Sequence, residues 1–154
     1  ELAAVAKVGN VLALHGYVKH EQKKLGGVDE DMNFHYTDIA KIKKLFDRQI
    51  RYNMDIAYEG ISGDYGLGIG RMIRSAYADD VVTRMKAYAA AASDARMSGC
   101  EMPVCILSGS GNQGITASVP VLVYAEALGA DEDKTLRALI VSDLITIHQK
   151  SFSE

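Results

Sequence analysis

The sequence predicts a mainly α-helical fold, in which the chain is a single helical domain and an internal fragment of a larger one. Apolar residues recur every three to four positions in residues 37–60, 79–97 and 131–150, which is the spacing of an amphipathic helix. With 154 residues, 48% of them hydrophobic, the chain can bury one core. We interpret both ends as cuts, because the chain opens without Met and ends directly after an apolar stretch.

The first 36 residues form a segment of uncertain structure, whereas residues 37–154 form the helical part. Residues 2–20 are rich in Ala, Val and Leu, but two glycines interrupt them and the periodicity is mixed. Helix and hairpin therefore both remain open for this stretch. Residues 21–33 are polar and predict a loop.

The first predicted helix begins at Thr37, a residue type that often caps a helix, and ends at Gly60, a typical C-cap residue. Its apolar positions are Ile39, Ile42, Phe46, Ile50 and Met54. Four glycines within residues 61–70 then predict a turn or a helix entry with close backbone approach. A short second helix is expected at about residues 71–76.

Residues 79–97 predict a third helix by both propensity and pattern. Its apolar side is expected to contain Val81, Val82, Met85, Tyr88, Ala89 and Ala92. The alanines of residues 87–92 imply that a neighbouring element packs very close to this helix.

Two further helices are predicted near the end of the chain. Residues 115–128 can form a helix with Pro120 near its first turns and Gly129 at its end. Residues 131–150 follow with acids in the first turn, which suit the positive end of the helix dipole. The apolar positions of this last helix are Leu136, Leu139, Ile140, Leu144 and Ile147.

Charge and composition exclude several classes of partner. The 17 basic and 20 acidic residues give a net charge of −3 without a long basic run, so we expect no nucleic acid partner. Residues 102–125 carry no charge, but the glycine-rich string within them argues against a membrane segment. The two cysteines, without a signal peptide, fit a reducing compartment, so we expect a cytoplasmic protein. Whether the protein is a homodimer stays open.

The most informative local feature is the string SGSGNQG, residues 108–114. Gly109, Gly111 and Gly114 match the dinucleotide pattern GxGxxG, but the acid expected about 20 residues on, at the end of a second strand, is missing. The string equally predicts a backbone cradle at a helix start, where a small carboxylate would fit. An ordinary capped loop is the alternative interpretation.

Other reactive side chains give weaker signals. Asp94 and Arg96 stand two positions apart on one helix, so they do not share a face, and such charges are usually exposed. Cys100 and Cys105 are too few for a four-iron cluster, and the four histidines lack metal-ligand spacing, so no metal site is predicted. Lys150 fits a helix C-terminus, although a buried cation in a pocket is the alternative.

Seven strings resemble one family in order and spacing, and together they cover about residues 37–150. They are NMDIAYEGI (53–61), YGLGIG (65–70), AASDARMSG (91–99), MPV (102–104), SGSGNQGITASVPV (108–121), LRAL (136–139) and LITIHQK (144–150). This is the L-cysteine desulfidase family, which is related to the alpha chain of iron-sulfur L-serine dehydratases. The resemblance identifies residues 37–154 as a fragment of a helical catalytic domain.

The resemblance implies a lyase that eliminates the β-substituent of L-cysteine, giving pyruvate, ammonia and sulfide, or of L-serine, giving pyruvate and ammonia. It implies a 4Fe-4S cluster in the full-length protein, with cysteine ligands in motifs upstream and downstream of this chain. Cys100 and Cys105 do not match those positions, so we expect no cluster in the fragment, which alone should be inactive. A noncatalytic module that binds a small amino acid or carboxylate is the alternative function.

We predict that seven residues form the site for a small amino-acid substrate. The substrate-binding residues are Ser108, Gly109, Ser110, Gly111, Asn112 and Gln113. Lys150 is the predicted catalytic residue, close enough to position or neutralise the carboxylate. A pyridoxal enzyme with Lys150 as its Schiff base is a weaker alternative, because nothing nearby resembles a phosphate cup.

Overall fold

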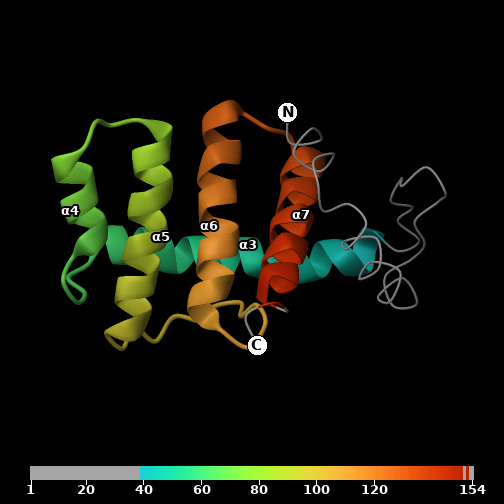
Figure 1. Ribbon diagram of the computed structural model, residues 1–154, viewed down its shortest axis with the longest axis horizontal. Coiled ribbons are helices and arrows are strands. Elements are labelled where there is room, and N and C mark those ends of the chain that lie inside the picture. The colour runs from blue at the N-terminus through green and yellow to red at the C-terminus, as the bar shows by residue number, and fades with distance from the viewer. Residues whose placement is uncertain (1–38, 151, 153–154) are drawn as a thin grey trace.

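The computed structural model describes residues 39–150 and 152, and five helices make up most of this part of the chain (Figure 1). They are α3 (Ile39–Ser62), α4 (Ile69–Ala76), α5 (Val81–Met97), α6 (Gly111–Leu128) and α7 (Glu132–Lys150). The described residues contain no strand, and their β-structure is limited to an isolated bridge between Leu107 and Ser110. The mainly α-helical prediction is therefore confirmed. The predictions for residues 1–36 and for the cap at Thr37 lie outside the described residues.

The helices α4, α5, α6 and α7 stand side by side in an up-and-down row, and α3 crosses behind all four of them (Figure 1). Because successive helices in the row alternate in direction, the end of α5, the start of α6 and the end of α7 lie at the same end of the row. Residues far apart in sequence are thereby gathered at one end of the molecule, which becomes the candidate site.

One face of the helix α3 carries a row of buried side chains, and the core forms around this row. Its buried side chains at helical spacing are Phe46, Gln49, Asn53, Met54, Ile56 and Ala57. The predicted C-cap at Gly60 is wrong, because α3 continues to Ser62 and Gly60 lies inside it. A Cβ at Gly60 would lie 2.2 Å from the carbonyl oxygen of Ala91, so this glycine lets α3 and α5 pack in backbone contact.

The helix α5 begins at Val81, after an N-cap at Asp80, and thus two residues later than predicted. Its buried side chains are Thr83, Ala87, Ala89, Ala91, Ala92 and Ala95. The predicted apolar side was partly wrong, since Val82 is 49% exposed. The buried face of α5 is the one that carries the alanines, because their small side chains allow α3 and α4 to approach closely. The close neighbour that the alanines implied is confirmed.

The helix α6 begins at Gly111, four residues before the predicted start, so Pro120 lies in mid-helix and not near the first turns. Gly129, with a φ of 60°, ends α6 as predicted. The helix α7 starts one residue after Asp131, whose carboxylate accepts the backbone N–H of Lys134 at 2.8 Å. Within the described part of the chain, none of the helices combines the length and apolarity that crossing a membrane requires.

Candidate functional site

The predicted substrate-binding string forms a tight turn followed directly by the first turn of α6. Ser108 and Gly109 both adopt left-handed backbone conformations, with φ of 50° and 81°. Ser110 is the N-cap of α6, and its hydroxyl oxygen accepts the N–H of Gln113 at 3.3 Å. A non-glycine residue in the left-handed region costs on the order of 1 kcal/mol, so the surrounding contacts must hold Ser108 in place.

The buried side-chain amide of Asn53 anchors the segment before this turn to α6. The side chain of Asn53 is fully buried, and its Oδ1 accepts the backbone N–H of Cys105 at 2.8 Å. Its Nδ2 donates to the Gly114 carbonyl at 3.2 Å and to the Ser118 hydroxyl at 2.8 Å. Sequence reasoning did not single out Asn53, and the only signal for it was its place in the string NMDIAYEGI.

The fit between this segment and α6 depends on Gly114. A Cβ at this position would lie 2.0 Å from the carbonyl oxygen of Cys105, so the chain before the turn lies directly on the first turns of α6. The third glycine of the string therefore serves close packing. The described residues place no strand beside the string, so the nucleotide alternative lacks its expected context.

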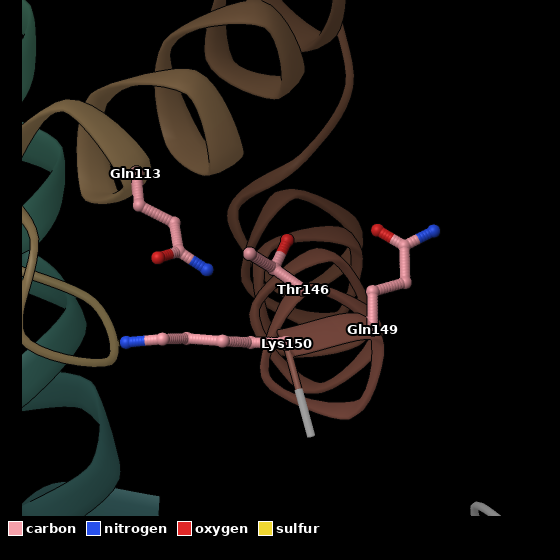
Figure 2. Close-up of a pocket in the computed structure, with 4 residues that line it drawn as sticks. All are labelled: Gln113, Thr146, Gln149 and Lys150. Atoms are coloured by element: carbon pink, nitrogen blue, oxygen red, sulfur yellow. The ribbon is translucent and has the colours of Figure 1, made fainter. Parts of the chain in front are cut away.

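Lys150, the last residue of α7, reaches across to the turn. Its Nζ donates to the carbonyl oxygen of Ser108 at 2.5 Å. An open hollow of about 430 Å³ lies beside this contact and is lined by Gln113, Thr146, Gln149 and Lys150. Figure 2 shows Gln113 and Lys150 reaching toward the same space from α6 and α7, whereas the Gln149 amide points away from Gln113. The structure thus brings Lys150 and the predicted string together.

Two charged side chains at the end of α5 make long-range contacts that the sequence did not predict. Arg96 donates from Nη1 to Oδ1 of Asn112 at 3.0 Å, so it joins α5 to the first turn of α6. The carboxylate of Asp94 accepts the backbone N–H groups of Leu67 at 3.3 Å and Ile69 at 3.1 Å, at the start of α4. The two charges do point to different elements, as their spacing indicated.

A buried carboxyl, that of Asp143 on α7, faces α3 and acts electrostatically on Cys105. Asp143 is only 9% exposed, and its Oδ1 accepts a hydrogen bond from Nε2 of Gln49 at 3.1 Å. Burial raises the pKa of Asp143 to about 6, although the Gln49 hydrogen bond acts in the opposite direction. Burial also raises the pKa of the Cys105 thiol, which disfavours the thiolate that metal binding requires.

The residues of this chain do not fit a four-iron cluster. Cys100 and Cys105 are half-buried free thiols. Over residues 39–150 and 152, no group of three or more His, Cys, Asp or Glu side chains is arranged to hold a metal ion. Since such clusters are held by several cysteines, the chain by itself does not provide that site.

A second hollow, of about 630 Å³, lies away from the predicted site residues. Its lining consists of Glu59, Tyr65, Gly99, Cys100, Glu101 and Met102. The Tyr65 hydroxyl donates to Oε1 of Glu59 at 2.8 Å, and this hydrogen bond, together with Cys100, raises the pKa of Tyr65. Tyr65 and Glu59 thus already pair with each other, so we keep the end of the row around Ser108 as the candidate site.

The fold and the site define an all-α protein whose polar residues converge on the start of one helix. The profile of the serine dehydratase alpha chain family matches residues 10–154, so the chain belongs to this family. This match confirms the family that the motifs predicted.

Curated relatives carry UPF0597 names. One from Desulfitobacterium hafniense (strain Y51) is 57% identical over 113 residues, covering 73% of this chain and 26% of the relative. Relatives from Lachnoclostridium phytofermentans and Fusobacterium nucleatum are 52% and 50% identical, each over 74% of this chain and 27% and 28% of the relative. The chain thus spans about a quarter of the length of these relatives. No solved structure matches it.

Proposed function

We propose that this chain is the substrate-holding part of a lyase that eliminates the β-substituent of L-serine or L-cysteine. Membership of the serine dehydratase alpha chain family supports the reaction class. The observation that carries the site is the contact of Lys150 with the Ser108 carbonyl, because it joins the end of α7 to the start of α6. Elimination from serine gives pyruvate and ammonia, and elimination from cysteine also releases sulfide.

In this proposal the turn and the first turn of α6 bind the substrate carboxylate. The start of a helix presents backbone N–H groups and a partial positive charge, both of which favour an anion. Lys150 adds an ammonium group on the α7 side, and the Arg96 guanidinium, which is hydrogen-bonded to Asn112, adds a second positive charge nearby on the α5 side. We assign Lys150 the role of positioning or neutralising the carboxylate beside residues 108–113.

In this proposal the chain binds the substrate, and none of its residues takes part in a reaction step on a metal. The family is linked to iron-sulfur clusters, yet the described residues of this chain do not fit one. The resemblance implies that cysteine ligands come from other parts of the full-length protein. The choice between a thiol and a hydroxyl leaving group would then depend on residues near those ligands.

The test is Asn112→Ala and Lys150→Gln in the full-length protein, with L-serine and L-cysteine as substrates. A charge-assisted hydrogen bond contributes about 1.5–3 kcal/mol, so either change should raise KM roughly tenfold or more. Thr116→Ala is the matched control, since Thr116 is exposed on α6 and bonds only to the carbonyls of Asn112 and Gln113 in its own helix.

Two results would contradict the proposal in different ways. If both variants keep the wild-type KM, the string is only a helix cap. If the full-length protein binds L-serine with these residues but forms no pyruvate, the noncatalytic binding module is the correct function.

A further inference from the structure

We propose that Arg96 is a positioning residue of this site: it fixes the Asn112 amide so that its NH₂ group faces the substrate carboxylate. The inference rests on the proposed function, since it concerns how the same string binds its anion. Arg96 would act through Asn112 without touching the substrate itself.

The hydrogen bond between the two side chains determines the orientation of the amide. A guanidinium group has donors and no acceptor, so only the oxygen end of an amide can face it. Nη1 of Arg96 donates to Oδ1 of Asn112 at 3.0 Å, which turns Nδ2 away from α5. Without Arg96 the amide could present either end outward, and half of its orientations would offer an oxygen to an incoming carboxylate. Arg96 removes that unfavourable orientation.

The guanidinium is held in place by the backbone of α6. A Cβ at Gly111 would lie 2.5 Å from Nε and 2.7 Å from Cζ of Arg96, so the group packs against the first residue of the helix. Any side chain at residue 111 would displace it. This contact explains why a glycine, a poor helix former, occupies the first position of α6.

The charge of Arg96 also indicates that an anion binds beside it, at the start of α6. A cation at the start of a helix is electrostatically unfavourable, because that end already carries partial positive charge. The ion pairs among the described residues join Lys43 to Glu132, Arg71 to Asp64, Lys134 to Asp131 and Arg137 to Asp133. None of them involves Arg96, so within the described part of the chain no carboxylate forms an ion pair with it. A bound substrate carboxylate would do so.

The experiment compares Arg96→Met, Arg96→Lys and Asn112→Asp in the full-length protein, with kcat and KM for L-serine and L-cysteine. Arg96→Met should raise KM roughly three- to tenfold with little change in kcat, because it frees the amide to rotate. Arg96→Lys should restore most of the affinity, because an ammonium group also donates to Oδ1. Asn112→Asp should raise KM more than Arg96→Met, because it removes the donor and adds a negative charge.

The outcomes separate this inference from the proposed function. If Asn112→Ala raises KM while Arg96→Met leaves it unchanged, the role of Arg96 is wrong and the carboxylate site stands. If neither change affects KM, the site itself is wrong. A fall in kcat and melting temperature that Arg96→Lys does not reverse would make Arg96 merely structural. Should Arg96→Met fail to fold, an unchanged KM in Asn112→Asp would overturn the inference on its own.

Discussion

The starts of α5 and α7 differ from the start of α6 in the charge placed beside them. Asp80 caps α5 by accepting the N–H of Thr83 at 2.7 Å, and Asp131 caps α7 in the same way. The helix α6 is capped by a neutral serine, has no acid in its first turn, and has Arg96 next to it. An acid at a helix start stabilises the helix. The acids at the starts of α5 and α7 therefore stabilise these helices, whereas the positive field at the start of α6 stays available for the carboxylate of the proposed site.

The largest expected effect concerns how the start of α6 is anchored. Asn53→Ala would leave the part-buried N–H of Cys105 without its amide partner, whereas the Gly114 carbonyl would keep the hydrogen bond from the Ser118 hydroxyl. An unsatisfied N–H costs about 1–3 kcal/mol and the cavity left by the side chain adds to the loss, so we expect the free energy of unfolding to fall by about 3 kcal/mol. Chemical denaturation followed by circular dichroism would measure this loss.

The control for Asn53→Ala is Ser62→Ala on the same helix. Ser62 is exposed and bonds only to carbonyls of its own helix, so its change should stay within about 0.5 kcal/mol. Equal effects of the two substitutions would mean that the buried amide does not anchor the turn.

A second, smaller effect should appear as a dependence of stability on pH. The pKa of Asp143 is raised to about 6 by burial, whereas an unfolded aspartate titrates near 4. Between these values the folded state holds a proton that the unfolded state lacks, so stability falls as pH rises and levels off above about 6. The loss should be on the order of 2 kcal/mol.

Unfolding measured from pH 4 to 7 tests this sign. Asp143→Asn should abolish the decline, because an amide does not titrate and can still accept from Gln49. Arg48 and Cys105 are the neighbouring groups that could contribute, and both remain in this variant. A decline of the same size in Asp143→Asn would show that another group titrates.

The sequence predicted the helices because their apolar spacing and cap residues are local signals. It placed the end of α3 wrongly at Gly60, because a glycine that permits helix contact looks the same in sequence as a C-cap. It also missed that α6 begins at Gly111, since glycines within the string indicated a loop. In each case the neighbouring helix decided the outcome.

The candidate site was predicted only in part for a related reason. The string 108–113 and Lys150 stood out through glycine spacing and family resemblance, and the structure brings them together. Asn53 did not stand out and Arg96 was interpreted only as a helix charge, because their partners lie far along the chain: Asn112 is 16 positions from Arg96, and the partners of Asn53 are 52 to 65 positions away. The sequence analysis did not single out Asp143, because its burial depends on its contact with Gln49 on α3.

The substitution with the smallest expected effect on stability, Ser110→Asp, tests most directly whether the start of α6 differs in function from the starts of α5 and α7. Ser110→Asp would give α6 the same kind of cap as α5 and α7. Aspartate caps a helix about as well as serine, and its charge adds about 0.3–1 kcal/mol at a helix start, so stability should stay level or rise slightly. The KM for L-serine should nevertheless rise about tenfold, because the new carboxylate repels that of the substrate.

Asp80→Ser is the matched reverse change on α5, where Asp80 accepts the N–H of Thr83. It should lower the melting temperature slightly and leave KM unchanged, because the start of α5 binds no ligand in this proposal. Stability and affinity should therefore move in opposite directions at Ser110, whereas at Asp80 only stability should move. If Ser110→Asp raises stability without weakening substrate binding, the neutral cap of α6 has no bearing on anion binding, and the positive field at this helix start serves no substrate.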